Sequence, residues 1–276
     1  MPGARRLALA LALALLGVTG CDDAPIQDIA RQTRGANYVE PVLLKAADGV
    51  VIHALDYRTV NPRAVILLFH QAGSSKSEYT TIAPVLIDQG FDALAIDQRS
   101  GGDMFVTNET VAARGKSTGY AEARPDIEAA LAWAKGQKLP IILWGSSYSA
   151  ALVFQVAADH PGEIAAVMAF SPGEYIGAKG AIAAAAAKVD APVYVTAAKT
   201  PAEEQAARAI FTAAPTKVKT FAIPRKAGIH GSSTLIAARN PDGAEENMKS
   251  VIAFLDRVIP GQEDDEKDED EKATTR

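Results

Sequence analysis

The sequence predicts an α/β fold, with a mostly parallel sheet of about eight strands and helices on both faces. Short apolar segments alternate with helical patterns of about ten to fifteen residues, which is typical of parallel sheets. The segment Ala64–Phe69 is apolar throughout, as expected for a strand that is buried on both faces. About 240 residues of ordinary composition lie between Asp22 and Gly261, a length that suits one domain with a large core.

The expected elements follow one another in a regular order across a domain that should span residues 38–261. Strands are expected at residues 39–44, 50–57, 64–69, 91–96, 140–143, 164–170, 192–197 and 218–223, with a hairpin turn at Asp48-Gly49 between the first two. Helices are expected at residues 77–89, 121–135, 148–159, 201–213 and 245–258. Residues 99–119 indicate a polar loop with several glycines. The alanine-rich residues 178–188 indicate a crossover helix in preference to a small lid.

The N-terminus has the pattern of a secretory signal. Two arginines precede a run of leucine and alanine from Leu7 to Leu16, which is too short to span a bilayer stably. Residues 1–20 are therefore expected to be a signal peptide. Cys21 is the only cysteine in the sequence, so a disulfide within the chain is excluded. Val18-Thr19-Gly20-Cys21 resembles the bacterial lipobox, so this cysteine is expected to carry a lipid. With Cys21 lipidated, residues 21–37 would tether the protein to a membrane on the periplasmic side of a bacterial cell envelope.

The C-terminus carries a block of charge. Residues 263–272 contain eight acidic residues and two lysines, so residues 262–276 are expected to form a disordered, solvated tail. The whole chain has a net charge of −5, which leaves the rest of the protein nearly neutral. Because no basic patch is present, no nucleic-acid partner is expected.

The segment Ile141–Leu152 carries the main functional signal. A strand pattern passes through small residues into a helical pattern, and Gly145-Ser146-Ser147-Tyr148-Ser149 matches the Gly-x-Ser-x-Gly nucleophile elbow, with Ser149 in place of the last glycine. The residues two before and two after the nucleophile must be small, because the turn presses them together. Around Ser147 these are glycine and serine, whereas around Ser146 they would be tryptophan and tyrosine. Ser147 is therefore the candidate nucleophile, and a simple helix cap is the alternative.

A serine nucleophile needs a base, which is usually histidine. Of the four histidines, His53 lies in an expected strand and His160 ends an expected helix. His70 ends the third strand and belongs to the loop considered next. His230 follows the last expected strand in a loop, and it is the candidate base.

The loop Phe69-His70-Gln71-Ala72-Gly73-Ser74 resembles the His-Gly-x-Gly loop that supplies an oxyanion hole, with Gln71 in place of the first glycine. A developing alkoxide needs backbone N–H donors from two directions. One donor is expected from Tyr148, directly after the nucleophile, and the other from Ala72 or Gln71. An ordinary turn is the alternative interpretation of this loop.

Two carboxylates compete for the role of orienting His230. Glu203 lies one turn after Thr200, which stands near the usual position of the acid, but Thr200-Pro201-Ala202-Glu203 also matches a helix capping box. Glu174 follows the sixth expected strand in a Pro-Gly turn, where a glutamate has no evident structural role. Glu174 is therefore preferred and Glu203 is the alternative, while Glu204 or the absence of an acid also stays open.

On these motifs the chain resembles the α/β-hydrolase superfamily over about residues 40–260, with the same order of nucleophile, acid and histidine. Its size and lack of a large lid domain are similar to the dienelactone-hydrolase-like group. Dienelactone hydrolases use a cysteine at the elbow, so Ser147 removes any specific claim to that substrate. The resemblance implies hydrolysis of a small-molecule ester or thioester through an acyl-enzyme, with His230 acting as base and then as acid. The alternative is a lipoprotein that kept the fold as a non-catalytic binding module.

No cofactor or metal is indicated by the sequence. It contains no His-Glu-x-x-His, no cysteine cluster and no phosphate-binding glycine-rich loop. Nothing in it specifies an oligomeric state.

Overall fold

The computed structural model describes residues 37–261. The expected signal peptide at residues 1–20, nearly all of the expected tether at residues 21–37 and the expected acidic tail at residues 262–276 lie outside this part. The expectations for those segments, including lipidation of Cys21, stay predictions.

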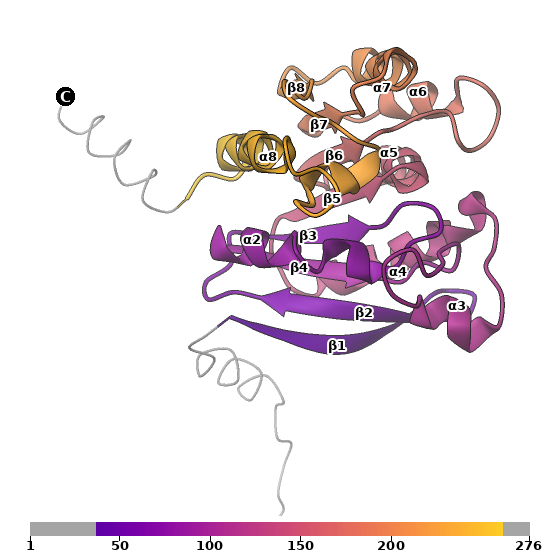
Figure 1. The fold of residues 1–276 in the computed structure, drawn as a ribbon. Coiled ribbons are helices and arrows are strands. Elements are labelled where there is room, and N and C mark those ends of the chain that lie inside the picture. Colours follow the sequence, from indigo (N-terminus) through magenta and orange to yellow (C-terminus); the bar gives the residue numbers. More distant parts are fainter. Residues whose placement is uncertain (1–36, 262–276) are drawn as a thin grey trace, which may run out of the picture. The chain divides into compact units, whose positions relative to one another are not determined.

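The described residues form one eight-stranded sheet (Figure 1). Its strands are β1 Tyr38–Lys45, β2 Val51–Arg58, β3 Ala64–Phe69, β4 Phe91–Ile96, β5 Ile141–Ser146, β6 Ala166–Phe170, β7 Val193–Thr196 and β8 Lys219–Ala222. They lie in the order β1-β2-β4-β3-β5-β6-β7-β8. The β1–β2 and β2–β4 pairs are antiparallel and the other neighbouring pairs are parallel. The predicted α/β class with a mostly parallel sheet is confirmed.

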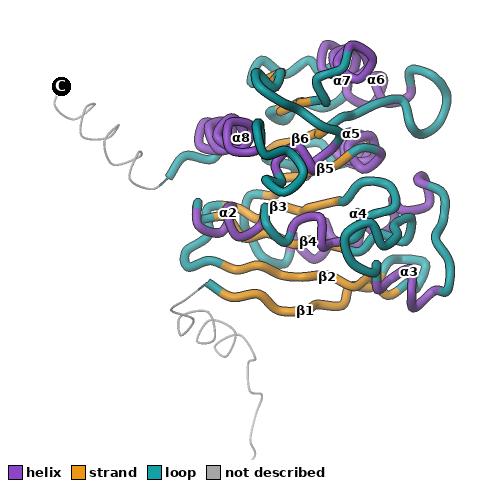
Figure 2. Tube along the Cα trace, viewed as in Figure 1, coloured by secondary structure: helices purple, strands orange, loops and turns teal. Residues whose placement is uncertain are grey.

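Helices cover both faces of this sheet (Figure 2). The α-helices are α2 Ala83–Asp88, α3 Glu109–Arg114, α4 Arg124–Lys135, α5 Tyr148–Asp159, α6 Ala181–Ala186, α7 Pro201–Ala213 and α8 Ala244–Val258, and the 3₁₀ helices are η1 Lys76–Tyr79, η2 Tyr120–Ala123 and η3 Gly231–Leu235.

The sheet divides the hydrophobic core into two layers. Alternate residues of β3 face opposite sides: Leu67 and Phe69 pack in the layer with α4, α5 and α7, and Ile66 and Leu68 in the layer with α2 and α8. All six residues of β3 are buried, which is why the strand has no polar residue.

Two segments differ from their expected form. The helix expected at residues 77–89 is divided into η1 and α2, because Pro84 lacks an N–H and occupies the first turn of a new helix. The loop expected at residues 99–119 contains α3. The Asn108 side chain accepts a hydrogen bond from the Val111 N–H at the start of α3, and Gly115 ends the helix with a φ of 75°.

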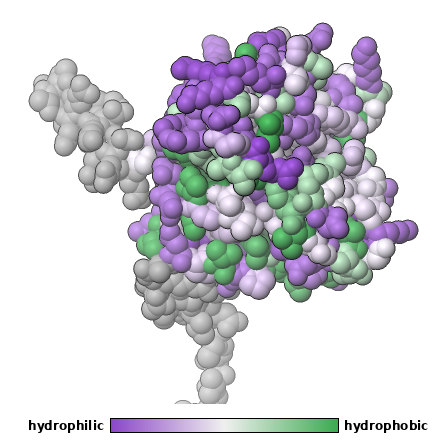
Figure 3. Space-filling model, in the orientation of Figure 1, coloured by the Kyte–Doolittle hydropathy of each residue, from purple (hydrophilic) through white to green (hydrophobic). Residues whose placement is uncertain are grey.

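The surface of this domain is mixed in character. Figure 3 shows hydrophilic residues over much of the visible face, with apolar residues scattered between them. None of the helices in residues 37–261 has both the length and the apolar character needed to cross a membrane.

The position of β3 in the sheet determines where a ligand can bind. The chain passes from β3 to β4 on one side and later to β5 on the other side, so the connections diverge between β3 and β5. Phe69 at the end of β3 pairs with Gly145 near the end of β5, which places the loops after these strands side by side. Open α/β sheets bind ligands beyond the carboxyl ends of strands at such a point.

Candidate active site

Ser147 lies at the turn between β5 and α5, with φ and ψ of 61° and −121°. This strained conformation is the one expected of a nucleophile elbow, and it persists only where the surroundings enforce it. The Ser147 N–H donates to Phe170 O of β6 at 2.8 Å. A Cβ at Gly145 would lie 2.4 Å from Ser149 O, so glycine is required there. The Ser147 side chain makes no capping bond to α5, which argues against the interpretation of this serine as a helix cap.

His230 reaches this serine from the loop between β8 and η3. Its Nε2 lies 2.8 Å from Ser147 Oγ, and its Nδ1 lies 3.0 Å from Glu203 Oε2. An ionised carboxylate can only accept, so Nδ1 carries the proton and Nε2 accepts from the Ser147 hydroxyl. The His230 side chain is 38% exposed, so the serine, histidine and carboxylate form a chain that solvent and small molecules can reach.

Glu203 reaches His230 from the first turn of α7. Partial burial raises the pKa of its carboxyl. Hydrogen bonds from His230 and Ser171, together with the charge of His230 and the Ala198 N–H, lower the pKa by more than burial raises it, so the net shift is downward. Glu203 Oε2 also accepts from the Ala198 N–H at 3.3 Å. The capping box is therefore only half formed. Thr200 Oγ1 accepts from the Glu203 N–H, but the Glu203 carboxylate turns away from α7 to His230.

The preference for Glu174 as the acid needs correction. Its two carboxylate oxygens accept from the N–H groups of Ile182 and Ala183, at 2.9 and 3.0 Å, at the start of α6. That helix begins after Gly180, which has no side chain to cap it, so Glu174 supplies the cap from the preceding loop. Glu174 therefore has a structural role that the sequence did not reveal, because the N–H groups it binds begin eight residues further along the chain.

Ser171 is a residue of this site that sequence reasoning missed. It follows β6 with a φ of 54°, which is unusual for a residue other than glycine. Its hydroxyl oxygen accepts from the Gly231 N–H at 3.0 Å, and the side chain also hydrogen-bonds Glu203. Ser171 thus links the acid to the backbone next to His230. A single serine after a strand gives no sequence signal for this position.

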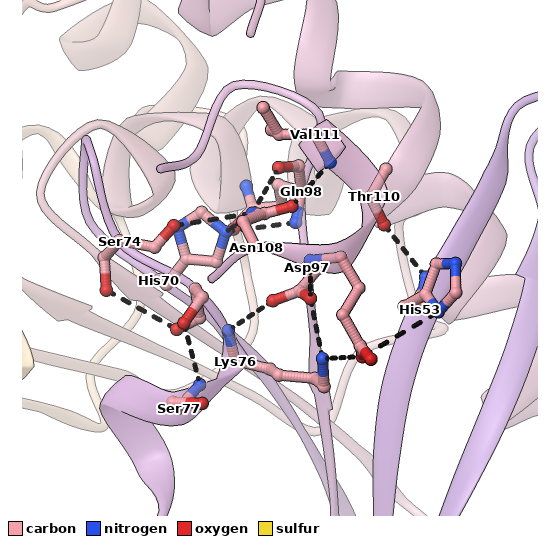
Figure 4. Close-up of polar contacts among 12 residues, drawn as sticks. His53, His70, Ser74, Lys76, Ser77, Asp97, Gln98, Asn108, Thr110 and Val111 are labelled. Carbon is pink, nitrogen blue, oxygen red and sulfur yellow. Dashed lines mark hydrogen bonds and ion pairs between the residues drawn. The ribbon is translucent and has the colours of Figure 1, made fainter. Parts of the chain in front are cut away.

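The loop after β3 is fixed by His70, which is fully buried. Its Nδ1–H donates to Gln71 O at 2.8 Å, and its Nε2 accepts from the Gln98 N–H at 3.0 Å. Burial lowers the pKa of His70, which agrees with a neutral ring bound to one acceptor and one donor. Figure 4 shows this ring beside Asn108, whose side-chain amide lies 3.3 Å from Nε2 and donates to Gln98 O at 3.0 Å.

The same figure shows the charged part of this network. Asp97, at the end of β4, accepts from the backbone N–H of Lys76 at 2.7 Å and of Glu109 at 2.8 Å, and its carboxylate pairs with Lys76 Nζ at 2.7 Å. These contacts join the loop after β3, the end of β4 and the start of α3. His70 and Gln98 in turn hydrogen-bond Ser149, so this network reaches the first turn of α5, next to Ser147.

Of the two oxyanion donors considered in the loop after β3, only Ala72 has a free N–H. The Gln71 N–H donates to Glu78 Oε2 at 2.8 Å, so the expectation that Gln71 could serve as the donor needs correction. Within residues 37–261, no hydrogen bond occupies the backbone N–H of Ala72 or Tyr148. These two groups are the available donors, one from the β3 loop and one from the start of α5.

The two departures from the family motifs have structural explanations. Ser149, which replaces the last glycine of the elbow motif, donates to His70 O at 2.6 Å and accepts from Gln98 Nε2 at 3.0 Å. Gln71, which replaces a glycine, donates from Nε2 to Ser233 Oγ at 2.9 Å and so connects the β3 loop to η3. Both substitutions add contacts around Ser147, so neither indicates a degraded site.

No metal site accompanies these residues. Within residues 37–261 no three or more histidine, cysteine, aspartate or glutamate side chains are grouped in a way that could hold a metal ion.

The model of the Hydrolase_4 family, described as serine aminopeptidase, S33, matches residues 60–225. The chain belongs to this family. It is an α/β-hydrolase, as its motifs predict. None of the curated proteins matches the chain.

Solved structures with the same fold include several hydrolases. A dienelactone hydrolase from Anabaena variabilis ATCC 29413 superimposes with a TM-score of 0.63 at 17% identity, covering 81% of this chain and 99% of that one. An esterase from Pyrococcus furiosus gives a TM-score of 0.61 at 17% identity, covering 88% and 98%. A monoacylglycerol lipase from Paleococcus ferrophilus gives 0.57 at 16% identity, covering 75% and 99%. At these identities the likeness establishes the fold alone.

Proposed function

We propose that this protein is a serine hydrolase of carboxylic esters or thioesters, with Ser147 as nucleophile, His230 as base and Glu203 as the orienting acid. The observation that carries the proposal is the 2.8 Å contact between His230 Nε2 and Ser147 Oγ at a strained elbow. A serine held within hydrogen-bond reach of an oriented imidazole is the arrangement that nucleophilic catalysis needs.

The geometry gives each residue a defined task. His230 Nε2 takes the proton of Ser147 as Oγ attacks the carbonyl carbon, and the resulting imidazolium is stabilised by the Glu203 carboxylate at Nδ1. When the tetrahedral intermediate collapses, Nε2–H gives its proton to the leaving alcohol or thiol and an acyl-enzyme remains. Water then attacks the acyl-enzyme with His230 as base. This step releases the carboxylic acid product and restores the Ser147 hydroxyl.

Negative charge on the carbonyl oxygen would be bound by the N–H groups of Ala72 and Tyr148. Tyr148 is the first residue of α5, so the positive end of the helix dipole adds to its N–H. The β3 loop is held by His70 and Ser149, so the Ala72 N–H is oriented before substrate binds. Such preorganised donors are worth roughly 3–4 kcal/mol each in the transition state.

Two observations support an ester with apolar groups as the substrate. The solved structures of similar fold include proteins described as esterases, a dienelactone hydrolase and a monoacylglycerol lipase. The Tyr175 hydroxyl donates to Ser171 O at 3.2 Å, and the Met104 N–H donates to Gly73 O in the loop after β3; these two residues are 40% and 47% exposed. Exposed apolar surface on segments that border the site favours an uncharged acyl or alcohol group.

We further propose that lipidation of Cys21 anchors the enzyme on the periplasmic side of a bacterial membrane. The signal pattern of residues 1–20 and the lipobox-like Val18-Thr19-Gly20-Cys21 support this location. The full-length protein expressed in a bacterium with radiolabelled palmitate should incorporate label in the membrane fraction. Cys21→Ser should remove that label, and labelling that persisted would rule out Cys21 as the site.

The enzymatic proposal is tested by labelling with a fluorophosphonate probe and by turnover of p-nitrophenyl esters of increasing acyl length. Wild-type protein should react with the probe and hydrolyse at least one ester, and Ser147→Ala should lose both properties. Ser250→Ala is a matched control. Ser250 lies on α8, away from the elbow, and its hydroxyl accepts a hydrogen bond from Tyr194 of β7. Probe labelling that survives Ser147→Ala would refute the assignment of the nucleophile.

A second set of substrates tests two other functions, which are peptidase activity and binding without catalysis. Aminoacyl p-nitroanilides test the activity in the family's description, and faster turnover of these than of esters would overturn the ester proposal. A binding module without catalysis would turn over neither class. Ester turnover that disappears in His230→Ala would exclude that alternative.

A further inference from the structure

Glu78 is a fully buried carboxylate that the proposed reaction does not use. Glu78 lies in η1 with no solvent exposure. Ser75 caps η1 by accepting a hydrogen bond from the Ser77 N–H, so the Glu78 carboxylate is not needed at the start of this helix. The Glu78 side chain points inward, between the loop after β3 and the end of β5.

Gln71 and Ser146 supply three hydrogen-bond donors to this carboxylate, and the Ser74 side chain also hydrogen-bonds it. Oε2 accepts from the Gln71 N–H at 2.8 Å, and Oε1 accepts from the Ser146 hydroxyl at 2.8 Å and from Gln71 Nε2 at 3.3 Å. The Ser146 hydroxyl has one proton, and its oxygen already accepts from the Ser232 N–H at 2.8 Å. All of these donors are satisfied together when Glu78 is ionised and only accepts.

The contacts of Glu78 join three segments that the proposed reaction uses. Gln71 belongs to the β3 loop, Ser146 precedes the nucleophile, and Ser232 follows His230 by two residues. Gln71 Nε2 also donates to Ser233 Oγ, which adds a second link between the β3 loop and η3. One carboxylate therefore lies at the junction of the oxyanion loop, the elbow and the loop that carries the base.

The peptide geometry around Gln71 shows what this junction controls. Glu78 holds the Gln71 N–H, and His70 Nδ1–H holds the Gln71 carbonyl. The peptide bond between Gln71 and Ala72 is trans, so its N–H points opposite to its carbonyl and therefore away from the His70 ring. With both peptide groups of Gln71 fixed, the direction of the Ala72 N–H is fixed as well.

We propose that Glu78 is a positioning residue for the hydrolase reaction, whose buried carboxylate holds the Ala72 N–H, Ser147 and His230 in one arrangement through Gln71, Ser146 and Ser232. This inference rests on the proposed function and deepens it. Glu78 touches no reacting atom, so its effect is on the geometry of the oxyanion donor and the base.

The buried surroundings of Glu78 disfavour its ionised form. Burial raises the pKa of Glu78 to about 7, although hydrogen bonds from Gln71, Ser146 and Ser74 and the nearby His230 lower it. The other titratable groups that interact with it are the phenols of Tyr79 and Tyr148, which are neutral. A raised folded pKa means that ionisation of Glu78 costs stability as the pH rises from about 4.5 through 7. A buried anion that lowers stability at neutral pH is typical of a group kept for function.

The test is Glu78→Gln at pH 8, with each rate divided by the number of sites that a fluorophosphonate titrates. The amide keeps the size of the side chain, but its NH₂ must face either Gln71 or Ser146, and one link is lost. We expect kcat per site to fall about 10- to 100-fold with KM within about twofold of wild type. The melting temperature at pH 8 should not fall, because the buried charge has been removed.

Two further variants complete the experiment. Ser146→Ala removes the link to Ser232 but leaves the Glu78–Gln71 contact, so kcat should fall several-fold. If Glu78→Gln does not fold, this variant tests whether Glu78 acts as a positioning residue. The matched control is Asp56→Asn in β2, another buried carboxylate with a raised pKa, which lies on the far side of β4 and β3 from β5. This control should leave kcat per site within about twofold of wild type.

Each outcome separates this inference from the proposed function. If kcat per site is within twofold of wild type in the folded Glu78→Gln variant, or in Ser146→Ala when the former does not fold, Glu78 is only structural. A wild type that turns over no ester, or a Ser147→Ala variant that keeps its activity, would overturn the proposed function and this inference with it. Loss of activity in Ser147→Ala with full activity in Glu78→Gln would overturn this inference alone.

Discussion

Two histidines lie at the carboxyl edge of the sheet, and their surroundings differ in every respect that matters for chemistry. His70, after β3, is fully buried and both of its ring nitrogens bind backbone groups. His230, after β8, has a side chain that is 38% exposed, and its nitrogens contact the side chains of Ser147 and Glu203. Proton transfer requires access to substrate and a partner that can change its protonation state. Only His230 has both, so the first histidine supports the site and the second is suited to carry out the reaction.

The largest expected effect is on the exposed side of this comparison. His230→Ala should lower kcat by roughly 10⁴- to 10⁶-fold, because Ser147 loses its base. The melting temperature should change little, since the imidazole is partly solvated. Ester turnover and differential scanning fluorimetry measure the two effects. A variant with more than a tenth of the wild-type rate would show that His230 is not the base.

The two candidate acids should separate as clearly as the two histidines. Glu203→Gln should lower kcat by about 10²- to 10⁴-fold, because the imidazole loses its orientation and the charge that stabilises it. Glu174→Gln should leave kcat unchanged and cost about 1 kcal/mol of unfolding free energy, since it weakens the cap of α6. Kinetics and urea unfolding of both variants test this. The opposite pattern would return the role of acid to Glu174.

On the buried side, His70→Asn should act on stability more than on chemistry. The asparagine amide can still donate to Gln71 O, but the Gln98 N–H loses its acceptor, which should cost about 1–3 kcal/mol. Urea unfolding at pH 7.5 measures this loss. A drop in kcat larger than that of Glu203→Gln would contradict the division of roles between the two histidines.

The pH dependence of stability provides a separate test of His70. Because burial lowers the pKa of His70 below its ordinary value of 6.5, the folded protein binds this proton more weakly than the unfolded chain does. Its contribution is therefore complete above pH 6.5 and is lost as the pH falls below that value. The difference in unfolding free energy between wild type and His70→Asn should shrink from pH 7.5 to pH 5. A difference that stayed constant would show that the ring does not remain neutral in the fold.

The smallest expected effect concerns Ser149, which lies two residues after Ser147 and donates a hydrogen bond to His70 O. Ser149→Gly restores the usual elbow motif but removes the bonds to His70 O and Gln98, and it places a glycine in the first turn of α5. We expect a loss of about 1–2 kcal/mol in unfolding free energy and a change in kcat of no more than about threefold. A gain in activity would indicate that the serine limits the site.

The parts of this protein that the sequence predicted well are those decided by local patterns. The continuous apolar run of Ala64–Phe69 predicted a doubly buried strand at the residues where it lies. The small residues around Ser147 indicated the elbow, because a tight turn excludes side chains at fixed positions in the chain. The helix α3 was missed, although Asn108 and Gly115 are capping signals, because the glycines before it suggested a loop throughout.

What the sequence by itself determined is the class of the sheet and the elbow with Ser147 at its turn, because apolar periodicity and turn sterics act over a few residues. His230 was identified by its position after the last expected strand, since loops after parallel strands gather at one edge of the sheet. The tertiary structure alone decided that Glu203 reaches His230 while Glu174 caps α6, that Glu78 occupies the Gln71 N–H, and that Ala72 keeps its own N–H free. A carboxylate can satisfy a helix end, an imidazole or a backbone amide equally well. Which of these it meets depends on how loops from separate strands are brought together at the edge of the sheet.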